Sequence, residues 1–324
     1  MRAGLPEFYA RAVDDIRRGR VKSSSESVLY ALSLLSRALQ REKDLALFAA
    51  LATEIVRSRP TSALMLNMVR EVLRAAVASV ERGLDEVSAA VEERRSELEK
   101  TLQDHVARAA LIAEKRLEDG DVVLTNTYSV FVKQTVLSAV KSGKKLSVVV
   151  AESRPGGEGA ELAAELADAG VPTQLVVDSA VRFIMREVDK VLVGSEAIAA
   201  NGANINKVGT SLIALAAHEA RVRVFVVASS LKLSPETLVG ELLEIPEADY
   251  EWGPESPGGR GKLKVRAPLF DVTPPQYIDA IVTERGLIAP QFAVMLVREI
   301  YGWPPALQSV SELAEELLRR GLGG

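Results

Sequence analysis

From residue 119 onward, short apolar runs alternate with segments of helical periodicity. The apolar runs have the length of strands and are rich in valine and leucine, and they lie at 122–124, 146–150, 174–177, 191–193 and 224–227. Helical patterns separate them, at 129–141, 160–169, 180–187 and 211–220. Short strands joined by helices of this length form βαβ units with right-handed crossovers. The alternation therefore predicts an α/β fold built on a doubly wound parallel sheet.

Residues 1–118 show a different pattern, in which apolar residues recur at helical spacing. Three segments between residues 28 and 77 each place leucine, valine and alanine on one helical face. Residues 84–118 are rich in Glu, Arg and Ala with spaced apolar positions, which is typical of a long amphipathic packing helix. These patterns predict an N-terminal helical domain over residues 1–118, followed by a C-terminal α/β domain over residues 119–324.

The rest of the second domain holds three weaker signals. Residues 246–268 are rich in proline and glycine, and we expect them to form an exposed loop inserted in this domain. A short apolar run at 281–283 resembles a further strand. An amphipathic pattern from about residue 310 to residue 318 predicts a terminal helix.

Composition excludes several classes of function. A chain of 324 residues with 48% hydrophobic residues can bury a sizeable core, and two domains are expected at this length. The formal net charge of −4 gives no electrostatic footprint for sequence-independent nucleic-acid binding, so we predict no direct nucleic-acid partner. The chain has no cysteine and 2 histidines, so we expect no disulfide, no thiolate chemistry, no metal site and no other cofactor.

The sequence gives no sign of a membrane protein. The N-terminal residues lack the continuous apolar core of a signal peptide, and no apolar run approaches the roughly 20 residues that a membrane span needs. We therefore expect a cytoplasmic protein without a membrane partner. Absent cysteine with abundant Arg, Glu and Ala is also a compositional hint of a thermophile.

Candidate site residues follow from the predicted sheet, because open parallel sheets bind ligands just beyond the carboxyl ends of their strands. The polar stretches that fall there are 125–129, 152–154 and 229–232, together with Glu196. These groups should meet at one edge of the sheet.

The segment around Glu196 carries the densest set of such groups. An apolar strand ends at this carboxylate, an Asn-Gly turn follows, and Asn206 and Lys207 come just before a predicted helix. The N–H groups and the dipole of a helix N-terminus attract phosphate, whereas a carboxylate and an amide suit hydroxyl groups. The segment therefore predicts a site for a small anionic polyol.

Each candidate also has an ordinary structural interpretation. Arg59, in a break between two helices, could be a surface arginine at a helix start. Arg154 follows a buried strand, where a ligand loop and a plain connection fit equally well. Glu196 is either a cap on the end of the sheet or a site residue, and Lys207 leaves a similar choice. Lys232 could be exposed loop charge.

Longer motifs resemble a known family. Asn-Lys-Val-Gly-Thr at 206–210 resembles the signature of the translation initiation factor 2B alpha/beta/delta regulatory-subunit family, which includes archaeal ribose-1,5-bisphosphate isomerase and methylthioribose-1-phosphate isomerase. Ser-Arg-Pro-Thr at 58–61 is similar to the family's phosphate-contacting turn, and Glu-Ser-Arg-Pro at 152–155 to a second loop. Three further segments resemble the archaeal ribose-1,5-bisphosphate isomerases in particular, at 178–180, 214–222 and 270–286.

The resemblance extends over about residues 10–300 and implies a Rossmann-like C-terminal domain, with a sugar-phosphate pocket between it and the helical domain. It also implies dimers that build larger assemblies. Arg18 stands roughly where the isomerases have a substrate-contacting Arg-Gly-Ala segment, although the residues after Gly19 differ. The predicted ligand and phosphate contacts are Arg18, Arg59, Ser129, Arg154, Asn206, Lys207 and Lys232, with Glu196 binding hydroxyls.

Two central positions depart from the isomerases. Those enzymes carry a cysteine after the first strand of the Rossmann-like domain and an aspartate after Val-Gly-Ala, whereas the matching residues here are Thr127 and Glu196. A thiol with a pKa of about 8.5 can work near neutrality, but an aliphatic hydroxyl has no pKa in that range. Glutamate keeps the charge but reaches about one methylene further, which shifts the carboxylate by a distance that matters for catalysis. The alpha subunits of the regulatory branch also carry glutamate here and lack the cysteine.

The leading prediction is therefore a regulatory member of the factor 2B family that is non-catalytic or weakly catalytic. It would bind a phosphorylated sugar or nucleotide between its domains and form a homodimer or a higher homo-oligomer, and the resemblance also implies initiation factor 2 as a partner. The alternative is an active ribose-1,5-bisphosphate isomerase in which Glu196 is the base and Thr127, or a bound water, replaces the thiol. A third interpretation is a scaffold subunit with an empty pocket.

Overall fold

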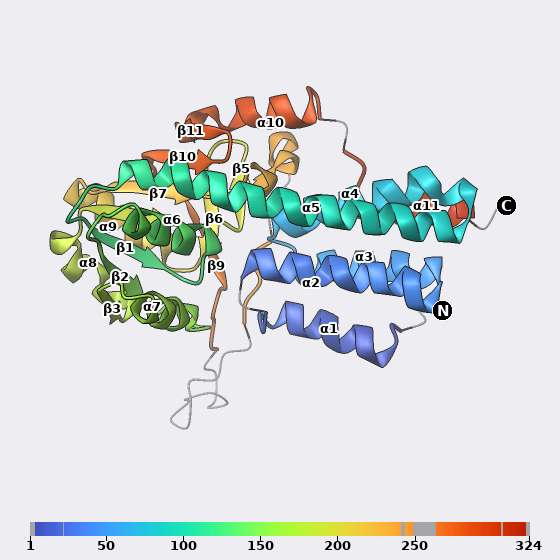
Figure 1. Cartoon of the computed structure of the whole chain (residues 1–324), viewed down its shortest axis with the longest axis horizontal. Helices are drawn as coiled ribbons and strands as arrows, with labels where there is room; N and C mark the ends of the chain where they lie inside the picture. The colour runs from blue at the N-terminus through green and yellow to red at the C-terminus, as the bar shows by residue number, and fades with distance from the viewer. Residues whose placement is uncertain (1–3, 22, 241–243, 249–263, 306, 322–324) are drawn as a thin grey trace.

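The computed structural model describes residues 4–21, 23–240, 244–248, 264–305 and 307–321. The first four helices lie at one end of the molecule, the strands lie at the other, and the long helix α5 (Leu84–Ala113) runs between the two (Figure 1). The predicted fold class, a helical N-terminal region followed by a mostly parallel α/β sheet, is confirmed.

The helical region is a bundle in which α2 (Ser24–Arg37), α3 (Leu45–Ser58) and α4 (Ala63–Ser79) begin at side-chain caps. Besides these helices and α5 it contains α1 (Glu7–Arg17). Ser23, Asp44 and Ser62 cap α2, α3 and α4 by accepting backbone N–H groups of the first turn. Large apolar side chains such as Phe48 and Met68 are fully buried among these helices. The caps fix where α2 and α4 start, and both starts lie near the site described below.

The larger sheet has seven strands in the order β11-β10-β7-β4-β1-β2-β3. The strands are β1 (Val122–Asn126), β2 (Ser147–Ala151), β3 (Thr173–Val176), β4 (Lys190–Val193), β7 (Arg223–Val227), β10 (Ala280–Thr283) and β11 (Gly286–Ile288). All neighbouring strands are parallel except β10 and β11. Each strand-like run of the sequence falls on one of the first six strands, so the predicted doubly wound sheet is confirmed.

Helices cover both faces of this sheet, which is why most positions of its central strands are apolar. The covering helices after β1 are α6 (Val130–Lys141), α7 (Glu158–Asp168), α8 (Val181–Ile184), α9 (Thr210–Ala220) and α10 (Ala293–Tyr301). Val123, Leu192 and Phe225 enter a core shared with α5 and α6, whereas Val191 and Val224 enter a core shared with α9 and α10. The first of these cores continues along α5 into the helical region, so one core joins the two regions.

A second, four-stranded sheet was not predicted. Its order is β8-β5-β6-β9, and its strands are β5 (Ala197–Ala199), β6 (Asn204–Lys207), β8 (Leu233–Ser234) and β9 (Phe270–Thr273). Between β5 and β6, Gly202 has a φ of +84° and the Asn201 side chain accepts the Ala203 N–H at 3.0 Å. Strands this short contain too few residues for alternation to show, so the sequence reveals only the turn. The resulting hairpin carries Asn206 and Lys207 at its end.

The terminal helix α11 (Val310–Gly321) returns to the helical region and packs against α3 and α4 (Figure 1). The sequence places this helix in the second domain, but its apolar residues Leu313 and Leu317 are buried in the core shared with the first helices. Amphipathic periodicity predicts a helix without indicating the surface on which it docks. The domain boundary at residues 118 and 119 stays a prediction.

The predicted exposed loop at 246–268 lies only in part within the described residues, since 249–263 fall outside them. Its two ends pair as an antiparallel ribbon. The Ala248 N–H donates to the Ala267 carbonyl at 2.8 Å, and the Leu269 N–H donates to the Pro246 carbonyl at 3.0 Å. The ribbon therefore forms at the base of the segment.

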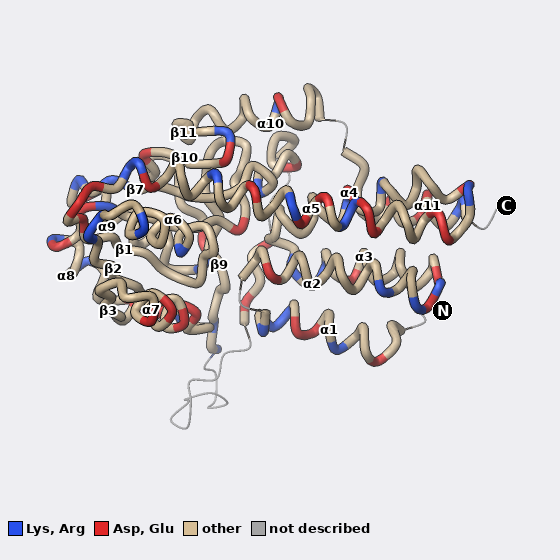
Figure 2. Tube along the Cα trace, in the orientation of Figure 1, with Lys and Arg blue, Asp and Glu red and all other residues tan. Residues whose placement is uncertain are grey.

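Charged residues of both signs are interspersed along the helices of the helical region, and Figure 2 shows them on α1 to α5, whereas the charged residues of α7 are all acidic. Such mixing is typical of solvent-facing helical surfaces. Within the part of the chain that the structure describes, no helix combines the length and the apolar character needed to cross a membrane.

Candidate functional site

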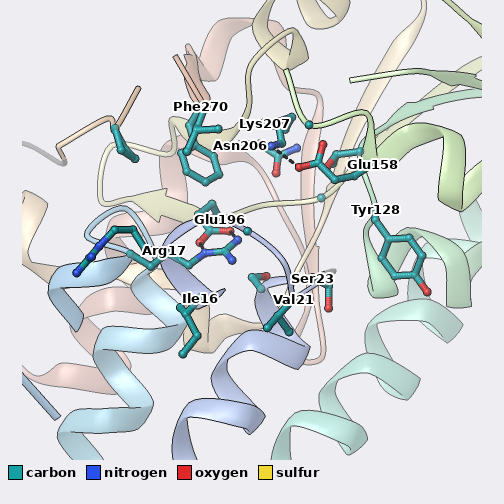
Figure 3. Close-up of a pocket in the computed structure, with 18 of the residues that line it drawn as sticks. Ile16, Arg17, Val21, Ser23, Tyr128, Glu158, Glu196, Asn206, Lys207 and Phe270 are labelled. Carbon is teal, nitrogen blue, oxygen red and sulfur yellow. Dashed lines mark hydrogen bonds and ion pairs between the residues drawn. The ribbon is translucent and has the colours of Figure 1, made fainter. Parts of the chain in front are cut away.

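A cavity of about 850 Å³ lies between the helical region and the carboxyl edge of the larger sheet (Figure 3). Its walls come from the loops after α1 and α3, from the start of α2, and from segments that follow β1, β2 and β4. Strand β1 lies between β2 and β4 in the sheet. This is the switch point of the topology, where doubly wound sheets bind ligands in the crevice beyond the strand ends.

All but one of the predicted site residues line this cavity, namely Arg18, Arg59, Thr127, Ser129, Glu196, Asn206, Lys207 and Lys232. Arg154 is the exception, because it is exposed and does not line the wall, whereas Pro155, Gly156 and Glu158 after it do. The Asp178 carboxylate accepts the Arg154 N–H at 2.7 Å and so fixes the backbone of this loop. The structure brings the other residues together, and their roles in binding stay proposals.

Arg59 and Glu196 form a bidentate ion pair at the cavity wall (Figure 3 labels Glu196). Arg59 Nε donates to Glu196 Oε1 at 2.7 Å and Nη2 donates to Oε2 at 3.1 Å, with the two side chains 15% and 5% exposed. Burial alone would raise the pKa of the Glu196 carboxyl, but the charge and hydrogen bonds of Arg59 outweigh burial and hold that pKa below its ordinary value. Arg59 is therefore not a surface arginine, and both oxygens of Glu196 are engaged.

Lys232 is buried, with 3% of its surface exposed, so it is not exposed loop charge. Its Nζ donates to the Ser24 hydroxyl at 2.9 Å and to the Ser195 carbonyl. No carboxylate of the described residues lies within ion-pair distance of it. Burial lowers the pKa of this ammonium to about 8, although nearby Glu196 opposes the shift. An ammonium with this pKa can exchange its proton near neutral pH.

Asn206 and Lys207 extend into the cavity from the end of β6. Lys207 Nζ lies 2.6 Å from Glu158 Oε1 and 5.8 Å from the centre of the Phe270 ring. Figure 3 marks the ion pair with Glu158 by a dashed line. The Asn206 amide donates to the Thr210 hydroxyl at 3.1 Å. Glu158, the first residue of α7, was not predicted from the sequence. The available signal was its place shortly after the Glu-Ser-Arg-Pro motif, in a loop that follows a strand.

Backbone strain is concentrated beside Thr127. Thr127 and Ser153 have φ values of +55° and +66°, in the left-handed region that residues other than glycine rarely adopt. The Ser153 hydroxyl accepts the Thr127 N–H at 2.7 Å and thereby ties the loops after β1 and β2 together. Within the described part of the chain the Thr127 hydroxyl has no hydrogen-bond partner. No neighbour there activates it as an acid or a base.

Ser129 begins α6, and its hydroxyl accepts the Val132 N–H at 3.3 Å. A Cβ atom on Gly194 would lie 2.7 Å from the Ser129 hydroxyl oxygen, so this close approach requires glycine. Gly194 thus lets the end of β4 lie directly against the start of α6, the helix that follows β1.

The N-terminus of α9 is occupied by a carboxylate from the chain itself. Asp271 accepts the Gly209 N–H at 2.8 Å and the Ser211 N–H at 3.1 Å. Burial raises the pKa of Asp271 to about 6, although these two N–H groups oppose the shift. The prediction that this helix end attracts phosphate was therefore wrong, because β9 supplies the anion.

The start of α2 lines the cavity instead. Ser23, Ser24 and Ser25 contribute to the wall, and the preceding loop adds Arg18, which is exposed and pairs with Asp14 at 2.7 Å. Hydroxyl groups at a helix start suit an anionic ligand, because the positive end of the helix dipole and the free N–H groups of the first turn also attract an anion there. The residues that differ from the isomerase Arg-Gly-Ala segment thus still form a polar wall.

Known proteins of one family are similar to the chain along most of its length. The model of the Initiation factor 2 subunit family matches residues 20–290. The ribose 1,5-bisphosphate isomerase of Archaeoglobus fulgidus is 38% identical over 301 residues, which are 92% of this chain and 95% of that protein. The enzyme of the same name from Methanocaldococcus jannaschii is 39% identical over 77% of this chain and 79% of its own length. The solved structure of the Pyrococcus horikoshii translation initiation factor eIF-2B superposes with a TM-score of 0.78 at 27% identity, covering 90% of this chain and 100% of that one.

These relatives overturn the prediction of a non-catalytic or weakly catalytic regulatory protein. Further proteins named ribose 1,5-bisphosphate isomerase are 37% and 38% identical over 76% and 78% of the chain. The prediction gave too much weight to Thr127 and Glu196. The physical reason is that Glu196 and Lys232 still place a carboxylate and a titratable ammonium in the cavity, so the missing thiol does not remove acid–base groups from it.

Proposed function

The chain belongs to the Initiation factor 2 subunit family, and we propose that it is a sugar-phosphate isomerase that converts ribose 1,5-bisphosphate to ribulose 1,5-bisphosphate. The observation that carries the proposal is the shared cavity, in which Glu196 and Lys232 are both buried. One is a carboxylate and the other an ammonium that can release a proton near neutrality. The relatives that bear the isomerase name support the choice of substrate.

The reaction breaks the bond between C1 and the ring oxygen and moves the hydrogen of C2, with its electron pair, to C1, so no atom is gained or lost. The site must take the proton of the C2 hydroxyl, which becomes the carbonyl, and give one proton to the ring oxygen. Glu196 is the proposed base, and it becomes available when a substrate phosphate competes with it for Arg59. Lys232 is the proposed acid, because the hydroxyl of Thr127 keeps its proton in this pH range.

The remaining cations and amides of the cavity suit the rest of the substrate. Arg18, Arg59 and Lys207 are the proposed phosphate contacts, and Asn206 and Ser129 the proposed hydroxyl contacts. The volume of about 850 Å³ lies within the range of about 300–1,000 Å³ typical of small-ligand sites. Arg154 is not part of the proposal, because it does not line the cavity.

The proposal is tested by a coupled assay for ribulose 1,5-bisphosphate with the wild-type protein and Glu196→Gln. We expect turnover by the wild-type protein and a loss of about 10²–10⁴-fold in kcat for the variant, because an amide cannot take a proton. Glutamine keeps nearly the same volume, and an unfolding curve checks that the variant is folded. A wild-type protein that binds ribose 1,5-bisphosphate without forming product would overturn the proposed activity.

Deprotonation of Lys232 is expected to lower the isomerase activity at alkaline pH. The ammonium of the free protein loses its proton as the pH rises through about 8, so kcat/KM, which reports the free protein, should fall above that pH and level off well below it. Lys232→Arg keeps the positive charge but holds its proton too tightly to donate it. We expect this variant to lose about 100-fold in kcat with little change in KM. A rise in KM at unchanged kcat would instead mean that Lys232 only binds the substrate.

Self-association stays a proposal. Phe183 on α8 and Leu212 and Leu215 on α9 are exposed, and these two helices lie in contact. Exposed apolar side chains gathered in one place favour contact with another chain. A contact with initiation factor 2 rests on family membership alone.

A further inference from the structure

Most cations of the cavity are paired with carboxylates of the chain itself. In three pairs a nitrogen and an oxygen approach within 2.7 Å, namely Arg59 with Glu196, Lys207 with Glu158, and Arg18 with Asp14. An arriving phosphate must therefore compete with a resident carboxylate for each of these cations. The outcome of each competition depends on how well the resident carboxylate is held.

The Lys207–Glu158 pair is held less well than the Arg59–Glu196 pair. Glu158 Oε1 is 2.6 Å from Lys207 Nζ, but Glu158 Oε2 is buried and has no hydrogen-bond partner among the described residues. A buried carboxylate oxygen without a hydrogen-bond donor destabilises the side-chain position in which it is buried. Both oxygens of Glu196, in contrast, accept hydrogen bonds from Arg59. Glu158 is thus the carboxylate that an incoming anion displaces more easily.

Gly156 provides the space that the Glu158 carboxylate occupies. A Cβ atom on Gly156 would lie 2.4 Å from Glu158 Oε1, so any larger residue would push the carboxylate aside. Gly156 does not have a positive φ, so alanine fits its backbone. The contact with Lys207 therefore depends on two features of one loop, a glutamate and a glycine two residues before it.

We propose that Glu158 is a specificity-determining residue, which holds Lys207 in the free protein and yields it only to a phosphate group. A phosphate dianion attracts the ammonium more strongly than a single carboxylate does, whereas a neutral or singly charged sugar does not. The inference rests on the proposed sugar-phosphate site, but not on turnover there. It adds to that site a residue whose contribution is to oppose weak anions.

The test is calorimetric titration with inorganic phosphate and with ribose 5-phosphate. If Glu158 competes with the ligand, Glu158→Gln should bind both probes about tenfold more tightly than the wild-type protein, because close charge pairs of this kind are coupled by at least that factor. Gly156→Ala should produce a similar gain, since it displaces the carboxylate without removing it. The matched control is Asp168→Asn, which removes the same charge from the exposed last residue of α7 and should leave affinity unchanged.

Equal or weaker phosphate binding by both Glu158→Gln and Gly156→Ala would overturn the inference, as would a failure of all the proteins to bind phosphate. Unfolding curves identify a variant that has lost its fold, and the other variant then decides. The isomerase assay on the same proteins separates the two proposals. A gain in affinity without turnover in any protein would support the proposed role of Glu158 and contradict the proposed isomerase activity. Turnover without a gain in affinity would contradict only the proposed role of Glu158.

Discussion

Thr127→Cys is expected to raise kcat for ribose 1,5-bisphosphate isomerisation by about 100-fold near pH 8. The family resemblance implies a cysteine at this position in the isomerases, and a thiol with a pKa of about 8.5 exchanges protons where a hydroxyl cannot. A well-placed general acid or base contributes about 10²–10⁴-fold. The Thr127 hydroxyl has no hydrogen-bond partner within the described part of the chain, so the substitution breaks no contact of that group.

Thr127→Ser is the matched control for this change. Thr127 has a φ of +55°, which is unfavourable for a β-branched residue, and both serine and cysteine remove the branch. A gain shared by the two variants would reflect relief of backbone strain, whereas a gain confined to cysteine reflects the thiol. Because the chain has no other cysteine, iodoacetamide would label this residue alone, and loss of the gain on labelling would complete the test. A cysteine variant no faster than the serine variant would show that position 127 has no acid–base role.

The main features of the fold could be predicted because they repeat locally. The central strands are mostly apolar because helices cover both faces of the sheet, and α6, α7 and α9, with 11 or 12 residues each, leave a clear change of period. The β5–β6 hairpin and the sheet that contains it could not be predicted, since its strands have two to four residues. The position of α11 could not be predicted either, because an apolar helical face does not indicate which surface it packs against.

The site residues that could be predicted are likewise those marked by a local sequence pattern. Glu196, Asn206 and Lys207 were found because they follow the end of a central strand, a place that the topology assigns to ligands. Arg59 lies 137 positions from Glu196 in the chain, and only the family motif indicated that it faces the site. The partners of these residues were missed. Glu158 and Asp271 satisfy Lys207 and the start of α9 from distant parts of the chain, and no local pattern encodes such a choice.

The Arg59–Glu196 ion pair is expected to stabilise the folded protein strongly. Arg59→Met is expected to lower the free energy of unfolding by about 3–5 kcal/mol, because it leaves an ionised carboxylate buried without the guanidinium that donates to both of its oxygens. Methionine retains much of the apolar stem, so the loss reports the charge. The loss should shrink as the pH falls, since without Arg59 burial raises the pKa of Glu196 and protonation then removes the unpaired charge.

Urea unfolding of Arg59→Met, Glu196→Gln and the double variant measures this coupling. Most of the loss should be recovered in the double variant, because no uncompensated charge remains. Arg57→Met is the matched control, since Arg57 pairs with Glu54 at 3.0 Å on the surface of α3, the helix that ends just before Arg59, with 59% of its side chain exposed. A surface pair of this kind contributes at most about 1 kcal/mol. If Arg59→Met costs no more than Arg57→Met, or if the double variant is no more stable than Arg59→Met, then Glu196 is not held as a buried anion, and it cannot be the base that substrate phosphate releases.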